Sequence, residues 1–131
     1  MTSLEKAVRT LLLADATIAA AVGARLYGSR MPQGVQYPAI VIHRISASRV
    51  RSLAGPSGYA IVRVQLDVWA VTYEQTKEIG DRIRAVLDGY AGTVEGVQFG
   101  NAEPVMEQDD FDGDVEAYRL IQDWMIGHRE V

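Results

Sequence analysis

Apolar and polar residues alternate most clearly over residues 58–71, GYAIVRVQLDVWAV. Every even position from 60 to 70 is apolar, whereas the odd positions include Arg63, Gln65 and Asp67. A two-residue period of this kind is typical of a β-strand with one face on a core and a more polar opposite face. We therefore predict that this stretch forms the central strand of a single sheet.

The pattern becomes helical directly after this strand. Thr72 and Gln75 form a capping-box pattern, the apolar residues that follow recur every three to four positions, and Gly89 marks the end. Similar patterns predict two more helices near the N-terminus. One covers residues 3–13, with Thr2 and Glu5 as its capping box, and the other covers residues 16–22, with Asp15 as its cap. An amphipathic helix that follows a long strand at once can lie back over the apolar face of that strand.

Three other segments, rich in β-branched and aromatic residues, also predict strands. They cover residues 38–46, 93–100 and 116–127, and residues 26–27 suggest a further short strand. The Gly-Pro-Ser-Gly tip at residues 55–58 predicts a hairpin that leads into the central strand. The order of elements predicts an α+β fold, in which helices pack on one face of a mainly antiparallel sheet of four to five strands.

The composition is that of an ordinary globular protein. The chain has 131 residues, of which 48% are hydrophobic and 23% are charged, and we expect a single domain over residues 1–131. No apolar run approaches the ~18 residues that a membrane span needs, and we expect no signal peptide and no membrane partner. The absence of cysteine excludes disulfides and thiol chemistry and fits assembly in a reducing cytoplasm.

The net charge of −4 conceals two segments of opposite charge. Residues 23–66 contain six arginines and no acidic residue, whereas residues 103–116 contain seven acidic residues and no basic one. Two solvated loops would explain this pattern, because charge runs usually face water. The alternative is a pair of complementary surfaces between neighbouring copies of the chain, or a basic lumen. The candidate contact residues are Arg44, Arg49, Arg51 and Arg63 on the basic segment, and Glu107, Asp109, Asp110, Asp112 and Asp114 on the acidic segment, which we expect to be an exposed loop.

The sequence lacks the motifs of catalysis, of cofactor binding and of metal binding. Nucleophile elbows, Walker loops and dinucleotide glycine patterns are missing, and the only histidines are His43 and His128. Residues 110–114 superficially resemble a calcium loop, but Val115 and Ile121 stand where that loop needs glycine and glutamate. We therefore expect no catalytic, cofactor-binding or metal-binding residues, and no enzyme activity.

Nucleic-acid binding is a weaker alternative. The arginines around the hairpin could meet phosphates, but the acidic net charge and the scarcity of lysine count against sequence-specific binding. A surface that only tolerates passing DNA remains compatible with the sequence.

Four segments carry further information through their order and length. They are LLLADATIAAAVGARLYG, the MPQG turn before PAIVIHRIS, the strand and helix VQLDVWAVTYEQTKEIGDRIRAVLDG, and the closing YRLIQDWMIGH. Together these segments resemble the tail-completion, or tail-terminator, proteins of long-tailed phages, prophages and phage-derived gene transfer agents.

The resemblance implies a small subunit that assembles into a closed ring, a homohexamer, on the last ring of a tail tube. Such a ring stops growth of the tail tube protein and offers a surface to the head–tail connector protein, at the head-proximal end of the virion tail. It is assembled in the host cytoplasm, and DNA would pass through it non-specifically. The family has no catalytic residues to carry over.

Two alternatives stay open. The first is another head–tail connector or minor tail protein of the same particle. The second is a small cytoplasmic enzyme or ligand-binding domain on the same α+β sandwich. Clustering of His43 with Asp67 or Asp123 in an enclosed pocket would favour this second alternative.

Overall fold

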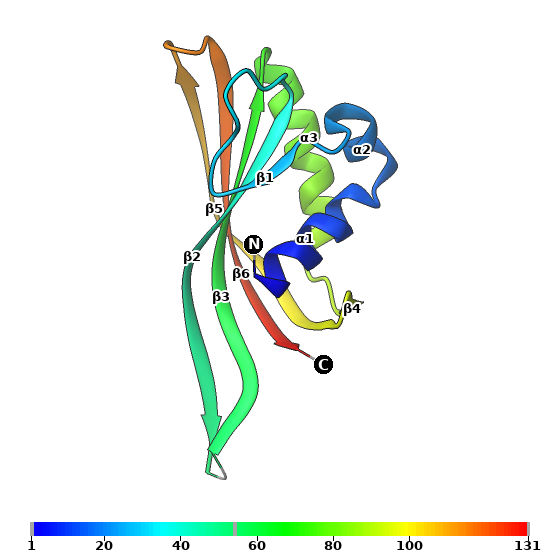
Figure 1. Cartoon of the computed structure of the whole chain (residues 1–131), viewed down its shortest axis with the longest axis vertical. Coiled ribbons are helices and arrows are strands. Elements are labelled where there is room, and N and C mark those ends of the chain that lie inside the picture. The colour runs from blue at the N-terminus through cyan, green and yellow to red at the C-terminus, as the bar shows by residue number, and fades with distance from the viewer. Residues whose placement is uncertain (1, 54, 131) are drawn as a thin grey trace.

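The computed structural model of the chain describes residues 2–53 and 55–130. In this part of the chain, three helices lie on one side of a six-stranded sheet (Figure 1). The elements in chain order are α1 (Ser3–Leu13), α2 (Ala16–Val22), β1 (Leu26–Gly28), β2 (Ala39–Ser52), β3 (Gly55–Ala70), α3 (Tyr73–Leu87), β4 (Gly92–Val94), β5 (Val97–Asp112) and β6 (Ala117–Glu130). The predicted α+β class and the helices on one face are confirmed.

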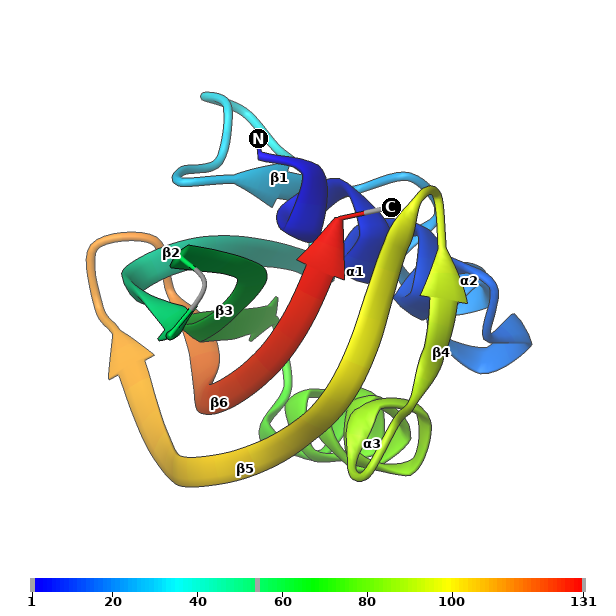
Figure 2. The same ribbon diagram turned by 90° about the horizontal axis from the view of Figure 1, so that it is seen from below.

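The sheet has the strand order β1-β2-β3-β6-β5-β4 and curls strongly when seen from below (Figure 2). β1 runs parallel to β2, and the other neighbouring strands are antiparallel. The prediction of four to five strands was too low, because residues 93–100 fall into two strands, β4 and the start of β5. Glu95 and Gly96, between these strands, have φ angles of 46° and 76°, which suits a tight two-residue hairpin turn.

Residues 103–112 of the acidic segment belong to a strand and not to the exposed loop that the sequence predicted, and residues 113–116 form the turn that follows. β5 continues to Asp112 and pairs with β6 from Val97, opposite Glu130, to Asp112, opposite Ala117. β4 pairs with residues 97–99 alone, so the rest of β5 has a neighbouring strand on one side only within the described residues. Charged side chains are common on such edge strands, because they discourage indiscriminate pairing. The many acidic residues of β5 therefore fit its position at the edge of the sheet.

The basic hairpin is also longer than the sequence predicted. β2 extends to Ser52 and β3 starts at Gly55, so the predicted tip at residues 55–58 belongs to β3. Ala54 lies outside the described residues. Figure 1 shows that this β2–β3 hairpin extends beyond the helices, and that the turn between β5 and β6 lies at the opposite end of the molecule.

The predicted faces of the central strand are confirmed. The helices cover the face formed by its even positions, and Val64 and Leu66 are fully buried there. The same core includes Leu12 of α1 and Ile83 of α3. The odd positions lie on the outer face of the sheet, where Ile61 is 39% exposed.

α3 approaches the sheet most closely at Gly80. A Cβ atom at this position would lie 2.3 Å from Cδ2 of Leu120 in β6, and Leu120 is fully buried. Gln122, two residues further along β6, donates a hydrogen bond of 3.1 Å from Nε2 to the Gly80 carbonyl. Because glycine has no side chain, α3 can pack closely against β6 at this position. This close packing brings the next turns of α3 within reach of β5.

Candidate assembly surfaces

Asp67 is the centre of a polar group on the outer face of the sheet. It is 1% exposed, its Oδ2 accepts a hydrogen bond of 2.7 Å from Arg119 Nη2, and its Oδ1 accepts one of 2.9 Å from Gln65. His43 Nε2 lies 3.1 Å from the same Oδ2. The clustering of His43 with Asp67 therefore occurs, but both carboxylate oxygens are engaged by neighbouring side chains. This arrangement holds β2, β3 and β6 together and leaves Asp67 poorly suited to act as a base.

Arg63, one of the predicted contact residues, is held within the chain. Its Nη2 donates to Asp123 Oδ2 at 2.5 Å, and the Asp123 side chain is only 5% exposed. Asp123 Oδ1 has no hydrogen-bond partner among the described residues. The carboxylate of Asp123 therefore depends on Arg63 for its charge compensation.

We expect Arg63→Ala to destabilise the fold, although the position of Arg63 on the polar face of its strand would suggest a mild effect. Removing the guanidinium leaves the buried carboxylate of Asp123 without a cation. The cost should be only about 1–3 kcal/mol, because Arg63 itself is partly exposed. Arg51→Ala is the matched control, since this exposed arginine has no ion pair in the described part of the chain, and should stay within about 0.5 kcal/mol of wild type. Urea unfolding of both variants measures the difference, and equal midpoints would contradict the assignment.

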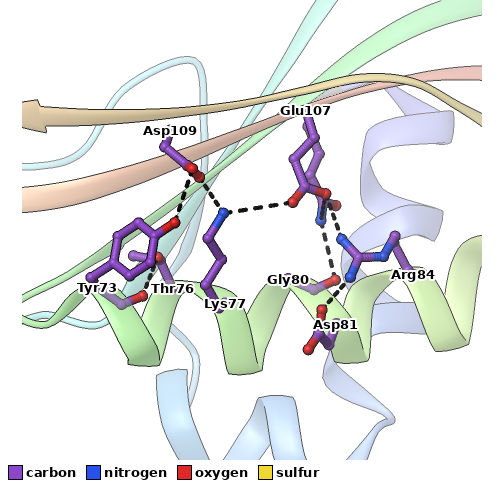
Figure 3. Close-up of polar contacts among 9 residues, drawn as sticks. Tyr73, Thr76, Lys77, Gly80, Asp81, Arg84, Glu107 and Asp109 are labelled. Carbon is purple, nitrogen blue, oxygen red and sulfur yellow. Dashed lines mark hydrogen bonds and ion pairs between the residues drawn. The ribbon is translucent and has the colours of Figure 1, made fainter.

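Two acidic residues of β5 form ion pairs with basic residues of α3 (Figure 3). Lys77 forms an ion pair with Asp109, and Arg84 forms one with Glu107. Tyr73 Oη also donates to Asp109 Oδ2 at 3.1 Å. The hydrogen bond from Lys77 holds the pKa of Asp109 below its usual range, and the same bond raises the pKa of Lys77. Glu107 and Asp109 therefore serve the fold of their own subunit.

Sequence reasoning did not assign Lys77 and Arg84, although a signal was present. They are seven positions apart, which places them on one face of a helix, and Glu107 and Asp109 have the two-residue spacing of one strand face. The spacing matches, but only the fold shows that these two faces meet.

The remaining six candidates have no ion pair in residues 2–53 and 55–130. Arg44, Arg49 and Arg51 are exposed on β2, Asp110 is exposed on β5, Asp112 is half-buried at its end, and Asp114 is exposed in the turn that follows. Because the two hairpins point in opposite directions, Arg49 and Arg51, toward the β2–β3 turn, lie far from the unpaired acids at the β5–β6 turn (Figure 1). Arg44 lies level with the middle of β5. The structure does not bring the unpaired basic and acidic groups together within one chain.

The two charged surfaces, on the β2–β3 hairpin and on the β5–β6 hairpin, also expose large apolar side chains. On the β2–β3 hairpin these include Ile45, which is 50% exposed, and Leu53, which is fully exposed. On the β5–β6 hairpin they include Val105 and Phe111, each 50% exposed. Apolar groups within a charged rim are typical of surfaces that bind other proteins.

Residues 2–53 and 55–130 contain no group of three or more histidine, acidic or cysteine side chains placed to hold a metal ion. Within these residues no helix combines the length and apolar character needed to cross a bilayer.

The two exposed, oppositely charged hairpins, each with apolar side chains at its surface, suit a structural subunit that contacts other proteins. The family model described as tail completion protein gp17 matches residues 6–129, so the chain belongs to this family. The protein is therefore a structural protein of the phage tail and not an enzyme, which excludes the alternative of a small cytoplasmic enzyme.

The fold has a counterpart among solved structures, whereas no curated protein matches the chain. A chain of the virion of a native gene transfer agent particle is 16% identical and superposes with a TM-score of 0.80. The match covers 96% of this chain and 94% of that chain. At this level of identity the similarity shows a shared fold.

Proposed function

We propose that the protein forms a closed ring on the end of the tail tube, stops polymerisation of the tube protein and provides the surface to which the head connector attaches. Membership of the tail-completion family and the shared fold with a gene transfer agent virion chain support this proposal. Six copies per ring, a head-proximal position, assembly in the host cytoplasm and non-specific passage of DNA belong to the same proposal.

The observation that carries the ring is the placement of unpaired charges on one subunit. Arg44, Arg49 and Arg51 lie on one hairpin, and the unpaired acids lie on the other hairpin at the far end (Figure 1). A two-fold contact through either surface would oppose like charges, whereas a head-to-tail contact pairs opposite charges. Head-to-tail contacts form a closed ring when the rotation between neighbours closes.

Deletion of the gene for this protein tests the proposed role in capping. Without a terminator, tail tubes should become overlong and should fail to join heads, and expression of the wild-type chain in trans should restore defined tail lengths. Electron microscopy of tails from the deletion strain measures both results. Tails of normal length that merely lack heads would instead favour the alternative of a connector or minor tail protein.

A further inference from the structure

Each charged surface contains a strand edge that has no neighbouring strand in the described part of the subunit. β1 pairs with β2 only at residues 40–42, and β4 pairs with β5 only at residues 97–99. The outward carbonyl of Ala102 accepts a hydrogen bond from the Gly89 N–H, so residues 43–52 of β2 and residues 103–112 of β5 form two free borders of the sheet. A free border offers backbone N–H and C=O groups to which another strand can pair.

The pairing pattern identifies which residues of the β2 edge face outward. Ile40 donates its N–H, and Ile42 offers its C=O, to the segment around β1, so the even residues face outward here. The direction alternates along a strand, and the one-residue register shift at residues 44–46 reverses the alternation. Ala47 and Arg49 therefore direct their backbone N–H and C=O groups away from β3.

The same alternation, carried through β3 and β6, fixes the β5 edge. Residues of β5 that lie opposite even residues of β6 face outward, and these are Glu107, Asp109 and Phe111. Pro104, opposite Trp124, also belongs to this outward set. Proline has no N–H to donate and is confined to such positions in a sheet, which supports the derived direction.

The strand directions permit antiparallel pairing between two copies. β2 is antiparallel to β3, β3 to β6, and β6 to β5, so β2 and β5 run in opposite directions on opposite sides of the central pair. Copies placed side by side in the same orientation bring β2 of one copy next to β5 of the following copy, and these two strands are then antiparallel.

We propose that the β2 edge of one copy, residues 43–52, adds as an antiparallel strand to the β5 edge of the next copy, residues 103–112, so that the sheet continues from subunit to subunit. This inference rests on the proposed ring. The opposite charges of the two edges attract the copies over about one Debye length, and like charges oppose pairing of either edge with itself. In a continuous sheet Arg44 and Arg49 lie on the helix-covered face and Asp110 and Asp112 lie on the outer face, so this attraction guides the approach of the copies and the backbone hydrogen bonds hold them together. The two edges lie toward opposite ends of the subunit, so each copy is shifted along the strand direction relative to its neighbour. A ring with such a shift closes only if its strands are tilted relative to the ring axis, as they are in β-barrels.

Ala47→Pro tests the backbone pairing without changing any charge. Proline removes one outward donor, and the N–H of Ala47 is not part of the β2–β3 ladder, so the subunit should still fold. Ala47→Thr keeps the donor at the same exposed position and is the matched control. We expect Ala47→Pro to raise the concentration needed for ring formation at least about tenfold, measured by native mass spectrometry, with the control near wild type. A folded Ala47→Pro protein that forms rings as readily as the control would overturn the inference.

Paired cysteines test the direction of pairing, since the chain has no cysteine of its own. Ser46 and Ser48 of β2, and residues 106, 108 and 110 of β5, all lie on the outer face of the sheet. With Ser46→Cys or Ser48→Cys combined with one cysteine on β5, oxidation should produce ladders of cross-linked subunits. Moving the β2 cysteine from residue 46 to residue 48 should move the best partner on β5 to a number lower by two. A shift in the same direction, or rings without cross-links, would contradict antiparallel addition.

The outcomes separate this inference from the ring itself. If charge reversals on the two hairpins abolish rings but Ala47→Pro leaves them intact, the ring survives and strand addition is wrong. If the wild-type chain forms no ring at high concentration or on tail tubes, the proposed function fails first.

Discussion

Replacing Leu66 with aspartate should abolish folding. Leu66 is fully buried between the sheet and the helices, and a carboxylate there would lose its water without gaining a partner. The cost is several kcal/mol, a large share of the roughly 5–15 kcal/mol that stabilises a typical domain. Val64→Asp should have the same effect, because Val64 is fully buried on the same face.

Ile61→Asp is the matched control on the same strand. Ile61 faces the outer side of the sheet and is 39% exposed, so the new carboxylate stays in contact with water and the loss of stability should be small. Thermal unfolding followed by circular dichroism compares the variants. Equal damage from Leu66→Asp and Ile61→Asp would mean that the faces of β3 are assigned incorrectly.

The elements that follow from local sequence were predicted correctly. The periods of β3 and α3, and the capping residues Thr2, Asp15 and Thr72, depend on neighbours within a few positions. Their hydrogen bonds confirm this, since Asp15 Oδ2 accepts from the Ile18 N–H and Thr72 Oγ1 accepts from the Gln75 N–H. Patterns of this range are visible in a single sequence.

The features that were missed depend on long-range register. Arg63 was expected on a wet surface, and its partner Asp123 lies 60 residues further along the chain. The acidic run was expected to be a loop because its β-propensity is poor. Its pairing with β6 outweighs that propensity and makes it a strand. Whether a carboxylate of β5 binds a cation of α3 or stays free follows from the face to which it points, and that face is set by the register shift after Pro104.

This division among the acids decides how the contact between copies should be tested. We expect the wild-type chain to be monomeric or weakly associated at low concentration and to form rings at high concentration or on the tail tube, because charged interfaces contribute more to specificity and association rate than to affinity. Reversing Arg49 and Arg51 to glutamate should leave the monomer folded, since neither residue has an ion pair in the described part of the chain, and should prevent ring closure. Sedimentation and electron microscopy of tail tubes measure closure and capping.

Restoring the charges on the other hairpin should restore the ring. Asp110→Arg with Asp112→Arg, both free of ion pairs among the described residues, should rescue the Arg49→Glu, Arg51→Glu chain. Glu107→Arg with Asp109→Arg should fail to rescue it, because these acids are bound to Arg84 and Lys77 and their reversal places like charges against each other between β5 and α3. If the arginine variant still forms rings and caps tails while only DNA passage or infectivity falls, the arginines line the channel. If rings, capping and infectivity are all unchanged, the basic hairpin is a solvated surface and the proposed contact is wrong.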